Sequence, residues 1–529
     1  MNLLFIVLFI TLISVLLKFV PKLSKIVIPL SVLLIISFYF LLTYNCKKDY
    51  FFPDKYSDTD PYKYNLLVNS LKNGNLFLYE INNFDNEAVD YLHKNDVYQN
   101  YFQYFNKNLQ VKKVFDLSYY KDKIYLYFGL TPVLLFYLPF NLLSGYCLSD
   151  NIIAFCLVSL IFIFSLLILK LFNKEFLHYD IKPHFLFLTT ILVGFCNYVM
   201  ILAIKAEIYE ICSLSATVLL LVAVYLFIKN ISINDKTKNN VLIFCIGLLL
   251  SLTVGARPHY VLFIPVVFFF VIYAEHSKGK NIKEILFSAT YFLVPCIIYG
   301  TVLALYNYYR FDSIFEFGWK YQLNSHNQYE YIATIKDFLI GLKYHLYQLP
   351  ENIKNNYTIF SFSMGKEHRI ANEFSVGLIY VCPLSMFLLF TPLILKKTNK
   401  NIITIFVLLF SLFFINFNIA CFFGAMRRYA FEYIYILTIL YFLSFFILDK
   451  NILNEKHRNL FFVLFILISV YMLYLHFCLL FCIHNSLMFI DKNNVDFYTK
   501  LINFLFNGNI PDNFLLNKLE NLVFLENLH

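Results

Sequence analysis

Charged residues are scarce in this sequence: Asp, Glu, Lys and Arg make up 15% of it, whereas hydrophobic residues make up 60%. Soluble domains carry about 25% charged residues, so this composition excludes a soluble globular protein. The eleven cysteines show no CxxC spacing, which argues against a disulfide framework and against a zinc site. No basic run is long enough to indicate nucleic-acid binding.

The apolar residues gather in long runs. A helix of about 20 apolar residues crosses the hydrocarbon core of a bilayer, which is about 30 Å thick. We therefore predict an all-α integral membrane protein with about twelve transmembrane helices. They are expected at residues 2–19, 27–44, 152–173, 185–204, 208–228, 240–256, 258–274, 284–305, 373–395, 402–423, 429–448 and 460–482.

One further apolar stretch, residues 125–146, is not expected to cross the membrane. It contains Pro132 and Pro139 and has no basic anchor. We predict that it forms an interfacial or re-entrant segment.

The basic residues predict the orientation. Six alternate connections between the expected helices carry lysine or arginine, and such short basic loops stay on the cytoplasmic side. These residues are Lys18, Lys22 and Lys25; Lys170, Lys174 and Lys182; Lys229, Lys236 and Lys238; Lys278, Lys280 and Lys283; Lys396, Lys397 and Lys400; and Lys450, Lys456 and Arg458. Both termini and two long loops, residues 45–151 and 306–372, would then be extracytoplasmic. The net charge of +9 agrees with this orientation, because basic residues on the cytoplasmic side contact anionic lipid headgroups.

A group of carboxylates follows the second expected helix, in the stretch "PDKYSDTDPYKYNLLVNSLKNG". From Pro61 onward, apolar residues recur at helical spacing up to a stop at Gly74, which predicts an amphipathic helix at the membrane surface. Asp60, directly before Pro61, either caps this helix or takes part in catalysis. Asp54 and Asp58 lie just upstream.

Arginines lie at the extracytoplasmic edge of other expected helices: Arg257 in "GARPHY", and Arg427 with Arg428 in "RRYAFEY". A guanidinium group at this depth contacts lipid headgroups, extends to water or binds an anion. Carboxylates and guanidinium groups on one face suit a reaction that releases a lipid-borne phosphate. A carboxylate would deprotonate the acceptor hydroxyl, and arginines would bind the departing phosphate.

The order of these segments resembles the GT-C superfamily of membrane glycosyltransferases, and among them the family 39-related bacterial enzymes that are similar to lipid A and protein mannosyltransferases. In that superfamily a span is followed by an acidic residue, an amphipathic helix, a D-x-S-x-Y segment and a proline-containing interfacial helix. Here these elements read Asp58/Asp60, "YKYNLLVNSLKNG" and "FDLSYYKDKIYLYFGLTP". The resemblance covers residues 27–448, with residues 1–26 as an extra N-terminal span and residues 449–529 as a last span and an extracytoplasmic tail.

The resemblance implies a hexosyl or pentosyl transferase of the cell (inner) membrane, with an extracytoplasmic active site. Its donor would be a polyprenyl-phosphate-linked sugar and its acceptor a lipid, a glycan or a protein. Asp60 or Asp58 would be the general base, and Asp116 a second acidic residue that orients the sugar or the acceptor. A strict acidic pair is replaced here by Asp58-Thr-Asp60, which leaves both candidates open.

The lipid-phosphate-binding residues implied by the resemblance are Arg257 and one of Arg427 and Arg428. His259 either assists them or faces the interface as an aromatic ring. Glu207 and Glu210 lie near the outer edge between two spans, and we expect a structural pair there with Lys205.

No cofactor is firmly implied. Some members of the superfamily need a divalent cation, but outside the aspartate group the sequence offers no carboxylate cage, so we predict no tightly bound metal. Two other functions remain open, an O-antigen-type polysaccharide polymerase or ligase and a transporter or flippase for a lipid-linked glycan.

Overall fold

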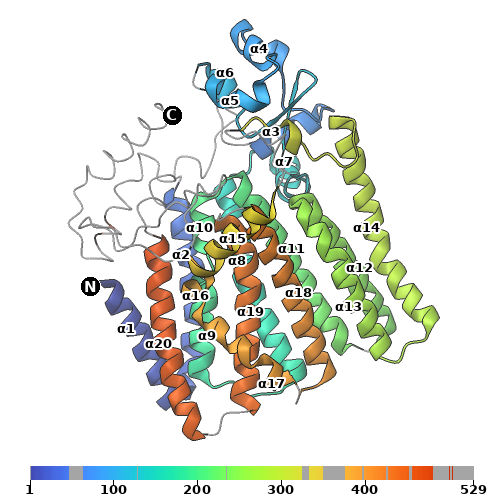
Figure 1. Ribbon diagram of the computed structural model, residues 1–529. Helices are drawn as coiled ribbons and strands as arrows, with labels where there is room; N and C mark the ends of the chain where they lie inside the picture. Colours follow the sequence, from blue (N-terminus) through green and yellow to red (C-terminus); the bar gives the residue numbers. More distant parts are fainter. Residues whose placement is uncertain are drawn as a thin grey trace.

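The computed structural model describes residues 2–46, 63–105, 107–127, 129–233, 235–324, 333–348, 376–395, 398–423, 427–451 and 455–480, together with Lys500 and Asn503. Over these ranges the protein is an all-α integral membrane protein with one small sheet (Figure 1). Within the described residues, ten helical segments are long and apolar enough to span a membrane. They are Pro21–Tyr44, Asp150–Leu177, Pro183–Lys205, Ile208–Ser232, Thr237–Ala256, Pro258–Ser277, Ile282–Phe311, Lys400–Phe423, Arg428–Lys450 and His457–Leu480.

These segments are built mainly from long α-helices. They are α2 (Ser24–Cys46), α8 (Asp150–Phe172), α9 (Pro183–Phe195), α10 (Val199–Lys205), α11 (Ile208–Ser232), α12 (Lys236–Ala256), α13 (Phe263–Ser277), α14 (Ile282–Phe311), α18 (Lys400–Phe423), α19 (Arg427–Asn451) and α20 (Glu455–Leu480). The apolar window of α19 is completely buried, so this helix forms the centre of the bundle.

The predicted count of twelve is not confirmed. Helix α1 (Asn2–Phe19) occupies the first predicted span, but it contributes only a shorter apolar helix, Ile6–Phe19. The segment expected at 373–395 is not one helix over its described part, residues 376–395. It consists of α16 (Leu378–Val381), the 3-10 helix η8 (Pro383–Phe390) and α17 (Thr391–Leu395), because a proline removes a backbone donor and interrupts an α-helix.

The span expected at 185–204 is interrupted between α9 and α10. Tyr198 takes a left-handed backbone conformation, with φ of 61°. Asn197 compensates for the lost helical bonds, because its side chain donates to the Val193 carbonyl (2.8 Å) and accepts from the Val199 N–H (3.2 Å). Both halves of the segment are buried in protein, where an irregular backbone is tolerated within a membrane.

The helices alternate in direction, so the bundle has two distinct ends. We call the end that carries residues 63–144 the domain end, and the other the basic end (Figure 1). The helix ends that flank all six predicted basic connections lie at the basic end. The predicted grouping of these connections thus agrees with the fold, and their assignment to the cytoplasm stays a prediction.

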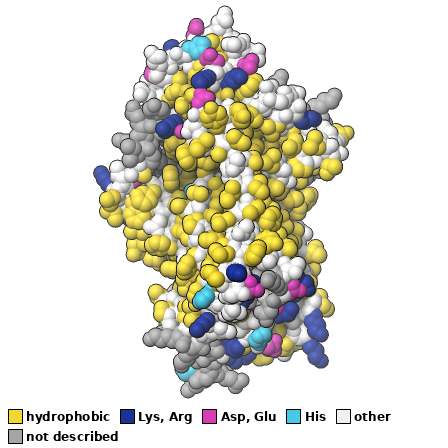
Figure 2. All heavy atoms as spheres, turned by 90° about the vertical axis from the view of Figure 1, so that its right-hand side faces the viewer, with side chains coloured by type: hydrophobic (Ala, Val, Ile, Leu, Met, Phe, Trp, Pro, Cys, Tyr) yellow, Lys and Arg dark blue, Asp and Glu magenta, His cyan; other side chains and the backbone are white. Residues whose placement is uncertain are grey.

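The surface shows the pattern expected of a membrane protein. Hydrophobic side chains cover the middle of the face seen in Figure 2, and Lys, Arg, Asp and Glu gather toward its two ends. Exposed apolar residues such as Leu33 on α2 and Ile297 on α14 are 63% and 65% accessible. Such residues are stable in contact with lipid, not water.

The domain end carries short helices around a three-stranded antiparallel sheet of order β1-β3-β2. The strands are β1 (Tyr79–Glu80), β2 (Ser118–Tyr120) and β3 (Lys123–Tyr125), and the helices are α3 (Lys63–Lys72), α4 (Asn86–Leu92), α5 (Val97–Phe105), α6 (Leu109–Lys113) and α7 (Leu138–Ser144). The helical segment Val133–Ser144 is too short to cross a bilayer, as predicted for residues 125–146.

Helix α3 confirms the amphipathic pattern. Tyr64, Leu67 and Val68 are buried on one face, and Gly74 follows the helix in the left-handed conformation, with φ of 75°. Asp54, Asp58, Asp60 and the predicted helix start at Pro61 lie outside the described residues.

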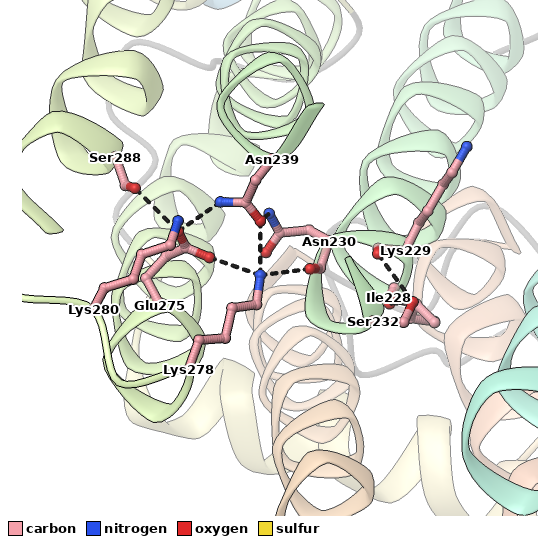
Figure 3. Close-up of polar contacts among 9 residues, drawn as sticks. All are labelled: Ile228, Lys229, Asn230, Ser232, Asn239, Glu275, Lys278, Lys280 and Ser288. Carbon is pink, nitrogen blue, oxygen red and sulfur yellow. Dashed lines mark hydrogen bonds and ion pairs between the residues drawn. The ribbon is translucent and has the colours of Figure 1, made fainter. Parts of the chain in front are cut away.

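At the basic end, a buried polar cluster joins four helices (Figure 3). Glu275 of α13 has no exposed surface and accepts hydrogen bonds from Asn239 of α12 (2.6 Å) and Ser288 of α14 (3.1 Å), and it pairs with Lys280. Lys278 donates to Glu275 (2.9 Å) and to the carbonyl of Asn230 on α11 (2.6 Å). The lysines of this connection, which is predicted to be cytoplasmic, thus hold the ends of α11, α12, α13 and α14 together.

Candidate active site

Asp116 lies between α6 and β2, where the short helices and the sheet of the domain end meet the bundle. Its backbone is left-handed, with φ of 60°, a conformation that Asp adopts more readily than most residues. Its N–H donates to the Leu323 carbonyl (2.8 Å), and Gln322 Nε2 donates to its Oδ1 (3.3 Å). Gln322 comes 206 residues later in the chain, so the position of Asp116 depends on tertiary structure.

Two cations act on the carboxylate of Asp116, which is partly exposed. Burial raises the pKa of Asp116, and the charges of Lys63 on α3 and Arg428 on α19 oppose that rise. Lys63 is held in place, because its Nζ donates to the carbonyl of Phe115 (2.8 Å). A carboxylate with a raised pKa accepts a proton more readily than an ordinary aspartate.

Arg428 and Asp116 share two neighbours. The guanidinium of Arg428 lies over the ring of Tyr209, with Cζ 4.1 Å from the ring centroid. The Tyr209 hydroxyl accepts a hydrogen bond from Gln322 Nε2 (3.0 Å) and also bonds to Asp116. The acid and the guanidinium therefore belong to one polar group at the domain end. Arg427 begins α19, but its side chain lies outside the described residues.

Arg257 and His259 meet at a carboxylate that the sequence analysis did not single out, Glu432 of α19. Arg257 donates to Glu432 Oε1 through Nε (2.8 Å), and its Nη2 lies 2.7 Å from the same oxygen. His259 Nε2 lies 3.1 Å from Oε2, and Ser213 Oγ donates to Oε1 (2.8 Å). The Glu432 side chain is 2% exposed, so this is a buried ion pair with additional hydrogen bonding.

Tyr429 links the two arginines. The Cζ atoms of Arg257 and Arg428 lie 5.3 Å and 5.7 Å from the centroid of its ring. Two of the three arginines that are candidates for binding the lipid phosphate thus lie close to one tyrosine ring. Two guanidinium groups beside an aromatic ring are a suitable site for an anion.

A signal for Glu432 was present in the sequence. An acidic residue inside an apolar helix is costly unless it is paired, and "RRYAFEY" contains one four residues after Arg428. The sequence could not identify its partner, because Arg257 comes 175 residues earlier.

The expected structural pair of Lys205 with a neighbouring glutamate is confirmed, and it lies at the domain end. Lys205 Nζ lies 3.3 Å from Glu210 Oε1, and both side chains are largely buried. Glu207 directly precedes α11, and its charge adds to the effect of burial in raising the pKa of Asp116.

The two candidate bases, Asp58 and Asp60, precede Lys63 by five and three residues and fall outside the described ranges, so their role stays a prediction. In the part of the chain that is described, no group of three or more His, Cys, Asp or Glu side chains is arranged to hold a metal ion. Metal dependence likewise stays a prediction.

Comparison with known proteins gives matches among solved structures. No protein-family model and no curated protein matches the sequence. Among solved structures, the chain is similar to the archaeal oligosaccharyltransferase AglB from Archaeoglobus fulgidus, solved in complex with an inhibitory peptide and a dolichol-phosphate. The TM-score is 0.42 and the identity 11%, over 86% of this chain and 56% of that one. The chain therefore spans little more than half the length of that protein.

Proposed function

We propose that this protein is a membrane glycosyltransferase that moves a sugar from a polyprenyl-phosphate carrier to a lipid, glycan or protein acceptor at the extracytoplasmic face. The observation that carries the proposal is the convergence of Asp116, Arg428 and Arg257 at the domain end of the bundle. These residues come from three distant parts of the chain and share the neighbours Tyr209 and Tyr429.

The reaction needs a proton acceptor and a site for a departing phosphate. The acceptor hydroxyl oxygen attacks the anomeric carbon of the sugar, and the bond from that carbon to the phosphate oxygen breaks. The hydroxyl proton passes to a carboxylate, and the polyprenyl phosphate leaves with the bonding electron pair. Guanidinium groups stabilise the negative charge that develops on the phosphate.

We assign these roles to the residues at the domain end. Asp60 or Asp58 is the proposed general base, and Asp116 orients the sugar or the acceptor. Arg428 and Arg257 bind the carrier phosphate. Within the pair formed with Glu432, His259 helps to hold Arg257 in position, which is a more specific role than an aromatic contact at the interface.

The interrupted span α9–α10 is the feature that a transporter would use. Broken helices in transporters expose backbone groups to a substrate near the middle of the membrane. Here Asn197 bonds to the backbone at the break, and the flanking residues Val193 and Val199 are buried. The break thus gives no support to a carrier function.

The test is transfer of a radiolabelled sugar from polyprenyl phosphate to a panel of acceptors by the purified protein in liposomes. We expect Asp60→Asn or Asp58→Asn to abolish transfer. Asp116→Asn should reduce it by about 100-fold, which is the size of effect expected when a substrate is no longer held in the reactive orientation. Arg428→Gln should lower the maximal rate and also raise the donor concentration needed for half-maximal rate, because Arg428 binds the phosphate and stabilises the charge that develops on it.

Asp312→Asn is the matched control. Asp312 is another left-handed aspartate at the domain end, with φ of 53°, but it is exposed and pairs with Lys121. Its replacement should leave transfer unchanged. Equal activity of the Asp116 and Asp312 variants would contradict the role given to Asp116, and equal activity of wild type and the Asp58/Asp60 double variant would contradict the proposed function.

A further inference from the structure

A groove of about 590 Å³ is lined by parts of α2, α8, α9 and α19. These parts lie at the basic end of the bundle, opposite the candidate active site (Figure 1). The size of the groove is within the range of ligand-binding pockets, about 300–1,000 Å³. Its walls are mainly apolar. The apolar residues include Ile28, Val32, Leu166, Leu169, Leu186 and Phe446.

The groove reaches the lipid-facing surface. Leu186, which lines it, is 37% exposed, and Leu30 and Leu33 on the neighbouring part of α2 are 53% and 63% exposed. A hydrocarbon chain could therefore enter from the bilayer and bury its surface against the groove walls.

Two polar atoms in the lining have no hydrogen-bond partner within the described part of the chain. Thr189 is 1% exposed, and its hydroxyl is unbonded, although the next residue, Thr190, donates to the Leu186 carbonyl in the usual helical manner. Asn173 donates to the Tyr179 carbonyl, but its Oδ1 is buried and unbonded. Buried polar atoms usually bond to protein, water or a ligand, so each of these two atoms is available to a polar group that enters the groove.

One charge of each sign completes the lining. Lys170 at the end of α8 and Asp180 before α9 are both exposed, and neither forms an ion pair with any residue that the structure describes. A lysine next to an apolar groove suits a phosphate, and an aspartate suits an ammonium group. Together they match a headgroup that carries both charges.

We propose that this groove binds a zwitterionic glycerophospholipid whose headgroup ends in a primary ammonium. One acyl chain fills the apolar groove, and the Thr189 hydroxyl donates to an ester carbonyl. Lys170 binds the phosphate. The ammonium donates to the carboxylate of Asp180 and to Oδ1 of Asn173, which a quaternary ammonium without N–H groups cannot do.

The site would act as a lipid anchor for α2. This helix packs against α8, α9 and α10, and Tyr39 donates to the Gly194 carbonyl in its other half. A bound acyl chain would complete its contacts at the basic end. This inference does not depend on the proposed glycosyltransfer, because the groove and the candidate active site lie at opposite ends of the bundle.

The test is native mass spectrometry of the purified full chain, titrated with phosphatidylethanolamine, phosphatidylcholine or phosphatidylglycerol of identical acyl chains. We expect phosphatidylethanolamine to bind about tenfold more tightly than phosphatidylcholine, because only its ammonium group can donate hydrogen bonds to Asp180 and Asn173. Asp180→Asn should remove most of this preference. Lys170→Gln and Thr189→Val should weaken the binding of all three lipids.

Two further variants make the result decisive. Asp180→Lys should transfer the preference to the anionic phosphatidylglycerol. Lys174→Gln is the control, because Lys174 lies four residues after Lys170 but pairs with Glu175 and does not line the groove. Equal binding of the three lipids, or a preference for phosphatidylethanolamine that survives Asp180→Asn, would overturn the proposal.

Discussion

Replacing Glu432 with glutamine should severely destabilise the domain end of the bundle. Glu432 is fully buried and neutralises Arg257, whose side chain is 11% exposed. Glutamine keeps the shape but removes the negative charge, and it turns an amide N–H₂ toward donors that need an acceptor. Ser213 and His259 would lose the same partner.

The expected size of the effect follows from this geometry. Breaking a buried ion pair by removing one member costs about 3–5 kcal/mol, because the remaining charge stays buried without compensation. An exposed pair gives the comparison. Glu80 and Lys123 are 4.0 Å apart with 43% and 40% exposed side chains, so Glu80→Gln should cost less than about 1 kcal/mol.

The assay is equilibrium unfolding of the purified variants in mixed detergent micelles. Arg257→Met, Glu432→Gln and the double variant form a thermodynamic cycle. The double variant should lose much less than the sum of the two single losses, because it leaves no buried charge unpaired. The ion pair would not hold these helices together if Glu432→Gln lowered the free energy of unfolding no more than Glu80→Gln does. The same conclusion would follow if the loss in the double variant equalled the sum of the two single losses.

The other predictions concern pH, the basic end and helix packing. Lys63→Met should move the acidic limb of the pH–rate profile to higher pH. Loss of this cation raises the pKa of Asp116, so its carboxylate is ionised only at higher pH. If the acidic limb did not move, the ionisation of Asp116 would not contribute to the reaction rate. Glu275→Gln should lower the free energy of unfolding by about 3–5 kcal/mol, measured as above, since it leaves buried lysines unpaired; a loss under about 1 kcal/mol would show that the cluster is not stabilising. Gly341→Ala should lower the melting temperature, because the new Cβ would lie 2.0 Å from a backbone oxygen of α18, whereas Gly300→Ala, with nothing within 4 Å, should raise it slightly; the reverse order would contradict this packing.

Much of the fold was open to prediction because its causes are local. A span is defined by a run of apolar residues, so most of the predicted spans correspond to long helices. The amphipathic face of α3 and its stop at Gly74 depend on spacing within twelve residues. Lys205 and Glu210 are separated by only the turn before α11, so their pairing could be anticipated as well.

Backbone breaks inside two of the predicted spans were not anticipated, although the span predicted at 185–204 is itself present as Pro183–Lys205. The segment at 376–395 is apolar enough to span, and the sequence does contain Pro383, but hydropathy does not distinguish one long helix from three short ones. Tyr198 and its two neighbours, Asn197 and Val199, are neither proline nor glycine. The interruption there is stabilised by Asn197 and by burial on all sides, which only packing creates.

The sequence by itself determined that this chain is a multi-pass helical membrane protein, since a bilayer accepts apolar helices and excludes nearly everything else. It also determined which connections share a face, because basic residues recur in every second one. Only the tertiary structure decided which charges meet. Arg257 pairs with Glu432, which is 175 residues away in the chain, and Asp116 accepts a hydrogen bond from Gln322, which is 206 residues away. Such pairings depend on how helices pack side by side, and no local pattern of residues encodes that.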